Sequence, residues 1–247
     1  MKAIYHGETD KGKIRVNNED RCLLQEINGR FLLAAAIDGV GGHYGGEIAA
    51  EIAHRCILEH VTASAGKGNN NEVLQAAVIY ANNSINSQRI NPLTNKMGCV
   101  LTAALIDLEQ GRLDISHIGD SRLYILKEGI LRQITKDHSH IAPLIESGKI
   151  TEEEAMKHPQ RNLVTRIAGE EILHWGTEYI QTHSFPLQPC TVLLCSDGLC
   201  DMIPPEHTRQ ILCAPGTVKE HTGKLIEAAL EAGGKDNVTV IVIEIME

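Results

Sequence analysis

The sequence is poor in aromatic residues, and it contains neither a long apolar run nor an excess of positive charge. Only 3% of its 247 residues are Phe, Trp or Tyr, so the core must consist mainly of Ile, Leu, Val and Ala. No run of about 18 apolar residues occurs, which excludes a membrane-spanning helix and predicts no membrane insertion. The formal net charge of -9 argues against a nucleic-acid partner, because such proteins need a basic face. The composition therefore fits a soluble globular protein.

Paired cysteine motifs and a secretory signal are also missing. None of the seven cysteines forms a CxxC pair, and the even spacing of Cys190, Cys195 and Cys200 does not resemble a zinc site. The first residues, MKAIYHGETDKGK, become polar too soon to form the apolar segment of a signal peptide. We therefore expect reduced, mostly buried thiols and a cytoplasmic location.

Neither a flexible linker nor an internal repeat divides the chain, which predicts a single domain over residues 1–247. Short apolar runs bounded by turn residues predict strands, and apolar residues at helical spacing predict helices. The expected strands are residues 31–37, 101–108, 113–118, 123–126, 192–195 and 238–245, and the expected helices are residues 47–61, 72–90 and 218–232. Strand and helix do not alternate strictly in this order, which favours antiparallel sheet with helices on its outer faces.

Two glycine-rich segments resemble nucleotide-binding motifs, but their context excludes that function. Residues 7–13, GETDKGK, nearly spell a phosphate-binding loop, yet Ile14 follows where Ser or Thr should contact magnesium. The glycine cluster of residues 39–46 follows a strand and precedes a helix, but no register in it matches GxGxxG. The second cluster therefore needs another explanation.

Carboxylates lie at or near the ends of several predicted strands. They are Asp38, Asp120, Asp197 and Asp236, together with the pair Glu19-Asp20. A single Asp-Gly pair is more often a turn than a site. Carboxylates at the ends of several strands can instead converge on one point, and oxygen ligands suit hard cations such as Mg²⁺ and Mn²⁺. Two such ions can bind a phosphoryl group and activate a bridging water, which points to phosphoryl chemistry.

Six motifs follow one another along nearly the whole chain. They are Arg15-x-x-Asn18-Glu19-Asp20, Asp38-Gly39-x-Gly41-Gly42-His43-x-Gly45-Gly46-Glu47, Gly119-Asp120-Ser121-Arg122, Asp137-His138-Ser139, Ser196-Asp197-Gly198-Leu199 and Asp236-Asn237. In this order they resemble the bacterial form of the PPM family, the metal-dependent phosphatase 2C-type serine/threonine protein phosphatases. The resemblance implies an α+β fold, a four-layer α-β-β-α sandwich of two antiparallel sheets flanked by helices. It also implies a mobile flap insertion at about residues 135–169.

The resemblance further implies a centre of two Mn²⁺ or Mg²⁺ ions that activates a bridging water. Asp38 would bridge both ions, and the carbonyl oxygen of Gly39 would complete the ligands of one of them. Asp197 and Asp236 would hold the other ion. Asp38, Asp197 and Asp236 are the expected core ligands of the metal centre.

Four further acidic residues have accessory roles in the family. Glu19 would act on the water shell of the metals, with Asp20 beside it. Asp120 and Asp201, together with Asp197, match the positions that hold a weaker third ion in bacterial relatives. We therefore expect eight metal-associated residues in this chain, of unequal importance.

Two residues have catalytic roles by the same resemblance. Arg15 would bind the substrate phosphate, since a guanidinium group can pair with two phosphate oxygens. His43 would be the general acid that protonates the leaving serine or threonine oxygen. The implied partners are phosphorylated proteins, including a Ser/Thr kinase and its substrates, and the implied state is a monomer.

One departure from the family pattern lies near this centre. Relatives usually carry Met-Gly-Thr-Thr where this chain has Met97-Gly98-Cys99-Val100, so two hydroxyl groups are lost. The change leaves a non-catalytic binding module as an alternative to an active enzyme, although all expected ligands are present. A sporulation-type phosphatase acting on small regulatory proteins is a third interpretation, but such relatives usually lack the full Arg15 and His43 pattern.

Overall fold

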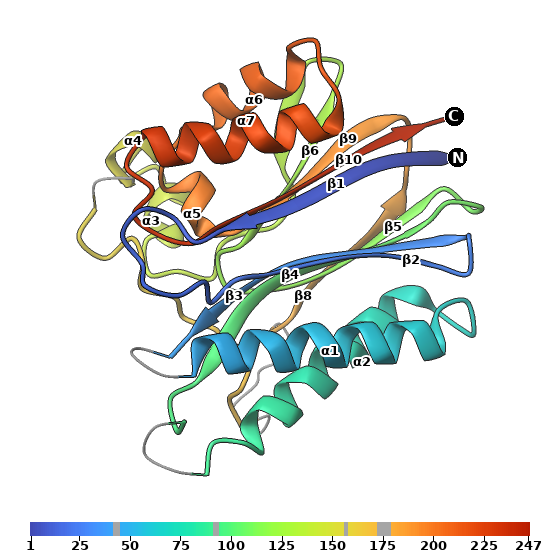
Figure 1. The fold of residues 1–247 in the computed structure, drawn as a ribbon, viewed down its shortest axis with the longest axis horizontal. Helices are drawn as coiled ribbons and strands as arrows, with labels where there is room; N and C mark the ends of the chain where they lie inside the picture. The colour runs from blue at the N-terminus through green and yellow to red at the C-terminus, as the bar shows by residue number, and fades with distance from the viewer. Residues whose placement is uncertain (42–44, 91–93, 156–157, 172–178) are drawn as a thin grey trace.

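The computed structural model describes every residue except 42–44, 91–93, 156–157 and 172–178. The chain forms four layers, in which two sheets face each other and helices cover the outer face of each (Figure 1). Helices α1 (Gly46–Ser64) and α2 (Asn70–Asn86) cover one sheet, and α6 (Pro205–Cys213) and α7 (Val218–Glu231) cover the other. This arrangement confirms the α-β-β-α sandwich implied by the resemblance.

Each sheet contains five strands, and all hydrogen-bonded neighbours in the described part of the chain are antiparallel. One sheet has the order β1 (Lys2–Asp10), β10 (Val238–Met246), β9 (Cys190–Cys195), β6 (Arg122–Lys127) and β7 (Ile130–Gln133). The other has the order β2 (Arg21–Ile27), β3 (Phe31–Val40), β4 (Gly98–Asp107), β5 (Arg112–Ile118) and β8 (Gln181–Pro186). The sequence pattern does not predict β1, β2 or β8, because polar residues interrupt their apolar positions, whereas β7 lies in the segment 99–134 that is expected to form consecutive strands.

Strand β3 shows how a sequence so poor in aromatic residues builds a core. Its side chains alternate between two apolar layers, with Leu33 and Ile37 facing α1 and Leu32 and Ala36 facing the other sheet. A strand that is buried on both faces needs a continuous apolar run, which explains the sequence FLLAAAI. A third apolar cluster joins α7 to β9 and β10. Within the described residues, no helix has both the length and the apolar character needed to cross a membrane.

The chain changes sheets between β5 and β6, at Gly119-Asp120-Ser121. Gly119 has φ +101°, and a Cβ atom added to it would lie 2.2 Å from the Cβ of Val100. Only glycine therefore fits this close crossing. The sequence predicts consecutive antiparallel strands over residues 99–134, but it gives no sign that the crossing places them in different sheets.

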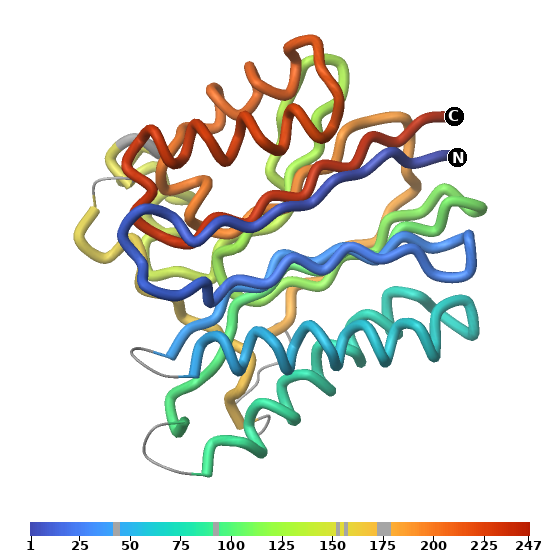
Figure 2. The backbone as a smooth tube through the Cα atoms, viewed as in Figure 1, coloured from blue at the N-terminus to red at the C-terminus, as the bar shows by residue number. Residues whose placement is uncertain are grey.

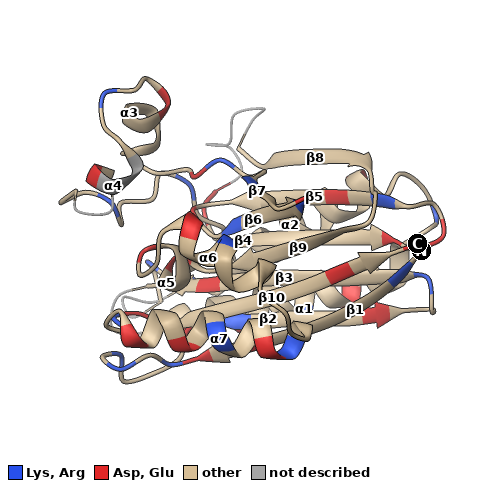
Figure 3. Ribbon diagram, turned by 90° about the horizontal axis from the view of Figure 1, so that it is seen from above, with Lys and Arg blue, Asp and Glu red and all other residues tan. Residues whose placement is uncertain are grey.

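Residues 135–169, the expected flap, leave the sandwich and return to it. They carry the short helices α3 (Ala142–Glu146) and α4 (Glu152–Ala155), which project from the layers (Figure 3). At the base, Thr165 N donates to His138 O at 2.7 Å and Cys99 pairs with Ala168. Thr151 caps the first turn of α4, since the Glu154 amide donates to Thr151 Oγ1 at 3.2 Å.

The first and last strands lie side by side along their whole length (Figure 2). Lys2 is opposite Met246 at one end, and Asp10 is opposite Val238 at the other. Both termini therefore lie at one end of the sandwich, and the loops that carry most of the predicted carboxylates lie at the opposite end.

Candidate metal centre

A cavity of about 280 Å³ lies at the end of the sandwich away from the termini. Its lining residues are Arg15, Glu19, Asp38, Gly39, Val40, Gly41, Asn162, Asp197, Asp236 and Asn237. The structure thus brings together six predicted site residues from β3, helix α5 (Asp197–Cys200) and the loops before β2 and β10. The convergence expected from the sequence is present.

The backbone around Asp38 explains why glycine follows it. Asp38 lies within β3, opposite Val100 of β4, so the expected strand continues past it. Gly39 N donates to Glu19 O at 3.2 Å, and a Cβ atom on Gly39 would lie 2.2 Å from Gly46 O. Three backbone segments meet here, and only a residue without a side chain allows that approach. Asp38-Gly39 is therefore a site for close backbone packing and not a turn.

Asn237 fixes the loop that precedes β2, a role that the sequence did not reveal. Its side-chain oxygen accepts from the Glu19 amide at 2.8 Å. Its Nδ2 donates to Lys11 O at 2.8 Å and to Asn17 O at 2.9 Å. One side chain thereby holds both ends of the loop that carries Arg15. The pair Asp236-Asn237 was the available signal, but polar side chains before a strand usually serve as simple caps.

Asp20 is buried near Asp38 and Asp197, although it is not among the described residues that line the cavity. Its carboxylate is only 1% exposed, and its Oδ2 accepts from Ser196 Oγ at 2.8 Å and from Thr239 Oγ1 at 2.7 Å. Its Oδ1 is buried and has no hydrogen-bond partner among the described residues. Burial raises the pKa of Asp20 to about 6, and the nearby charge of Asp236 contributes. One oxygen of this carboxylate is therefore available for a ligand.

Asp38 and Asp197 share an environment that opposes negative charge. Burial raises the pKa of Asp38 well above its usual value, and repulsion from Asp20, Asp197, Asp120 and Asp236 adds to the shift. The pKa of Asp197 is raised in the same way, first by burial and then by neighbouring carboxylates.

The same cluster contains a carboxylate oxygen that takes part in no hydrogen bond among the described residues. Asp197 Oδ1 is buried without a hydrogen-bond partner among the described residues. Crowded, underpaired carboxylates are stabilised by divalent cations, so this donor set fits Mn²⁺ or Mg²⁺. The carboxylates surround the cavity but are not yet arranged as a metal coordination shell. Among the described residues, no compact group of three metal-ligating side chains occurs.

A second cavity, of about 240 Å³, lies beside the first and shares Asp197 with it. Asp120 and Asp201 line this second cavity, so the structure separates the two residues expected at a third ion from Asp38 and Asp236. Burial raises the pKa of Asp120 to about 7, with repulsion from Asp137 and Asp201. Asp201 Oδ2 accepts from Arg161 Nε at 3.1 Å, which ties the flap to α5.

Arg15 lines the main cavity with its guanidinium group held by one of the expected metal ligands. Its Nη2 lies 2.7 Å from Asp236 Oδ2, and the arginine side chain is 51% exposed. The hydrogen bond to Asp236 raises the pKa of Arg15, so the group stays fully charged. A permanent cation at the rim of an acidic cavity can bind a phosphate while the cavity binds metal.

Glu19 faces a second glutamate that the sequence did not single out for a role. Burial, followed by the charge of Glu47, raises the pKa of Glu19. Glycine suits position 46, because a Cβ atom on it would lie 2.8 Å from the backbone oxygen of Gly39 and 2.4 Å from Glu19 Oε2. The motif Gly45-Gly46-Glu47 was the available signal. His43, the expected general acid, lies outside the described residues.

The structure gives a physical account of the Cys99-Val100 departure. Val100 is buried and lies against Gly119 at the crossing between the sheets, where valine has nearly the same shape as threonine. Cys99 is fully buried, and burial together with the charge of Asp38 raises the pKa of its thiol. Both replacements are packed side chains, and neither displaces a predicted ligand.

The fold and the cavity define the class of this protein: an α-β-β-α sandwich with a carboxylate centre suited to hard divalent cations. The sequence pattern of the family described as Protein phosphatase 2C matches residues 13–231. The chain therefore belongs to the Protein phosphatase 2C family.

Individual relatives agree with this assignment. The chain is 40% identical over 245 residues to the serine/threonine protein phosphatase PstP of Mycobacterium tuberculosis, and the match covers 98% of this chain but 45% of that protein. It thus spans about half the length of this relative. The serine/threonine phosphatase stp of Listeria monocytogenes is 35% identical over 241 residues, with 96% of this chain and 93% of that protein covered. The solved catalytic domain of PstP in complex with two manganese ions superposes with a TM-score of 0.86 at 36% identity, covering 99% of both chains.

Proposed function

We propose that this chain hydrolyses phosphoserine and phosphothreonine esters in proteins, using two bound Mn²⁺ or Mg²⁺ ions. One observation carries the proposal: Asp20, Asp38, Asp197 and Asp236 come from four separate segments, and their charges oppose one another around one centre. The phosphatase names of the relatives support the substrate class, and the two-manganese structure of PstP supports the cofactor.

Within this proposal Asp38, Asp197, Asp236 and the Gly39 carbonyl hold the two ions. The ions would offset the phosphate charge and lower the pKa of water towards neutrality. Two hydroxyl groups donate to Oδ2 of Asp20, which leaves its Oδ1 free for a ligand. Glu19 acts on the surrounding water, and it is held near Asp38 by the backbone bond to Gly39.

Arg15 and His43 would act on the substrate itself. Arg15 would exchange its bond to Asp236 for two phosphate oxygens, a geometry that a lysine could not match. His43 would donate a proton to the leaving serine or threonine oxygen, because an alkoxide is a poor leaving group. Asp120 and Asp201, in the second cavity, would hold a weaker third ion with Asp197.

The remaining expectations belong to the same proposal. Residues 1–247 would act as one phosphatase domain, since β1 and β10 pair within one sheet. The protein would act as a monomer in the cytoplasm on phosphorylated proteins, including a Ser/Thr kinase and its substrates. All seven cysteines are free, which agrees with a reducing compartment.

Hydrolysis of p-nitrophenyl phosphate and of a phosphothreonine peptide tests the proposal. We expect turnover of both substrates with Mn²⁺ and loss of turnover with a chelator. Calorimetric titration of Mn²⁺ into the metal-free protein adds a readout that is independent of catalysis. Binding of Mn²⁺ without any turnover would favour the non-catalytic binding module, and absence of both would refute the metal centre.

A further inference from the structure

The loop between β1 and β2 exposes aliphatic side chains at the rim of the proposed catalytic cavity. Ile14 is 68% exposed and Val16 is 86% exposed, and they flank Arg15, which lines the cavity. Leu163, which is 48% exposed, follows Asn162 of the same lining. Three exposed aliphatic side chains therefore belong to residues that directly adjoin the lining of the cavity in the sequence.

The backbone of this loop is held in place although its side chains are exposed. Asn237 Nδ2 donates to the carbonyl oxygens of Lys11 and Asn17, at the two ends of the loop. Lys13 N donates to Gly234 O at 2.8 Å. The aliphatic side chains are therefore presented from a fixed backbone, and binding to them requires little ordering of the loop.

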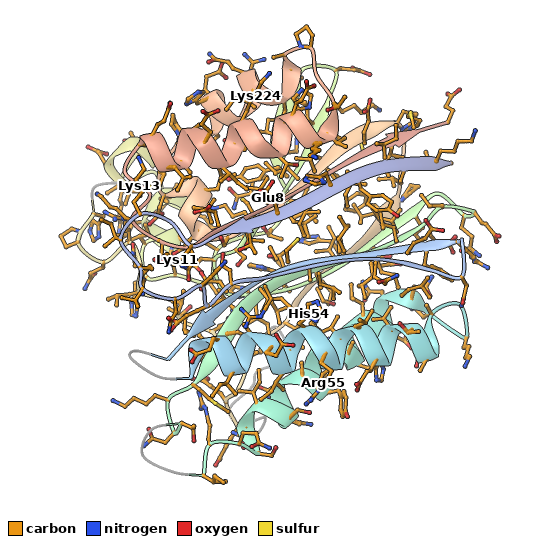
Figure 4. All side chains as sticks on the ribbon, viewed as in Figure 1. Glu8, Lys11, Lys13, His54, Arg55 and Lys224 are labelled. Atoms are coloured by element: carbon orange, nitrogen blue, oxygen red, sulfur yellow. The ribbon has the colours of Figure 1, made fainter. Side chains whose placement is uncertain are left out.

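The loop is also basic in a chain whose net charge is -9. Lys11 and Lys13 are exposed, and Figure 4 shows both on the segment that follows β1, far from Lys224 on α7. With Arg15 they form a short row of positive charge next to the acidic cavity. Such a row attracts an acidic partner and repels a basic one.

We propose that this loop, residues 11–16, selects the polypeptide segment around the phosphorylated residue. Ile14 and Val16 contact an aliphatic side chain next to the phosphorylated serine or threonine, and Lys11 and Lys13 favour acidic residues beyond it. The occupant is a substrate segment because the row is continuous with Arg15, the proposed phosphate ligand. The inference rests on the proposed function and assigns it a class of substrate.

A comparison of three substrates tests this assignment. They are p-nitrophenyl phosphate, a phosphothreonine peptide with Leu and Ile beside the phosphorylated residue, and the same peptide with Gly at those positions. For the unaltered protein we expect kcat/KM to be about tenfold higher for the aliphatic peptide, equivalent to about 1.4 kcal/mol. In the double variant Ile14→Ser, Val16→Ser this preference should disappear, while turnover of p-nitrophenyl phosphate stays unchanged.

Ile130→Ser is the matched control, since Ile130 is 62% exposed but lies on β7. It should keep the full preference for the aliphatic peptide. For charge, Lys13→Glu should lower kcat/KM on a peptide with acidic flanks, and Lys224→Glu should not. Equal losses on both peptides, or no preference in the unaltered protein, would overturn the assignment. Absence of p-nitrophenyl phosphate turnover with Mn²⁺ would instead refute the proposed function.

Discussion

Asp38 combines the features expected of a bridging ligand at the scale of one residue. It is held by the strand ladder between β3 and β4, and it is surrounded by four other carboxylates. The substitution Asp38→Asn keeps the shape of the side chain but removes the negative charge that would hold both ions. We expect kcat on p-nitrophenyl phosphate to fall by about three orders of magnitude, since metal binding supplies several kcal/mol of transition-state stabilisation.

Asp114→Asn is a suitable control for this variant. Asp114 is fully buried, but it lies in β5 and accepts a hydrogen bond from Ser184, away from the cavity. The specific activity of the Asp114→Asn variant should match that of the unaltered protein. If Asp38→Asn retained most of its turnover, Asp38 would not be a shared ligand.

His43 gives a second prediction at this scale, based on the chemistry of the leaving group. His43→Ala should lower kcat on a phosphothreonine peptide by about two orders of magnitude, the usual contribution of a general acid. p-Nitrophenolate leaves without a proton, so its release should be slowed much less. Measurement of both substrates under the same conditions checks this, and equal losses would rule out His43 as the acid.

The sequence predicts the residues that carry charge better than the residues that hold them. Asp38, Asp197 and Asp236 were recognisable because their motifs occur in a fixed order along the chain. The contacts of Asn237 and of Glu47 could not be recognised from the sequence, because each involves a backbone or side chain that is distant in sequence. Such contacts become visible only when the fold places the segments together.

At the scale of elements, the crossing between β5 and β6 depends on one glycine. Gly119→Ala would place a methyl group 2.2 Å from Val100 Cβ in a backbone with φ +101°. We expect the free energy of unfolding to fall by about 2–4 kcal/mol from strain and overpacking. Chemical denaturation measures this change directly.

Gly129→Ala separates strain from crowding. Gly129 has φ +75°, but apart from its chain neighbours no heavy atom of the described residues lies within 4 Å of a Cβ atom added there. This variant should lose only about 1 kcal/mol, the cost of the left-handed backbone alone. Similar losses in both variants would show that the contact with Val100 does not matter.

The flap gives a second prediction at this scale. The helices α3 and α4 are short, and none of the described residues of α3 is buried. We expect amide hydrogens of residues 140–155 to exchange much faster than those of β3 and β4, because local opening there exposes little apolar surface. Hydrogen exchange followed by mass spectrometry tests this, and equal protection in flap and strands would contradict it.

Strands buried on both faces could be predicted from the sequence, whereas the edge strands β1, β2 and β8 could not. The run FLLAAAI is apolar throughout because both of its faces are covered. Edge strands such as β8, with the sequence QTHSFP, pack less completely and lack that signal. The change of sheet at Gly119 was also hidden, since it depends on how distant strands pair.

For the whole molecule, the buried carboxylates link stability to pH and to metal. Burial raises the pKa of Asp20 to about 6 and that of Asp120 to about 7, above the ordinary value of 3.8. As pH rises from about 4 to 7, the unfolded chain releases these protons before the folded protein does, so the free energy of unfolding falls. Mn²⁺ needs the deprotonated forms and offsets their repulsion. We therefore expect Mn²⁺ to raise Tm more at about pH 7.5 than at about pH 5, by 2–4 °C for each kcal/mol gained.

Buried His117 acts in the opposite direction and must be separated from this effect. Burial lowers its pKa to about 4, so its contribution to stability is lost as pH falls below about 6.5. The loss occurs with and without metal. The difference between Tm in Mn²⁺ and Tm in a chelator therefore isolates the carboxylates. An equal difference at both pH values would show that the carboxylates are already ionised.

The position of β10 has a consequence for how the protein is made. The strand made last among those described lies between β1, which is made first, and β9. During synthesis, β1 therefore has no neighbour in its sheet until Val238–Met246 has left the ribosome. Asp236 and Asn237 arrive at the same moment, so the acidic cavity and the loop carrying Arg15 are completed only then. Nascent chains that stop after α7 should consequently be unable to capture metal.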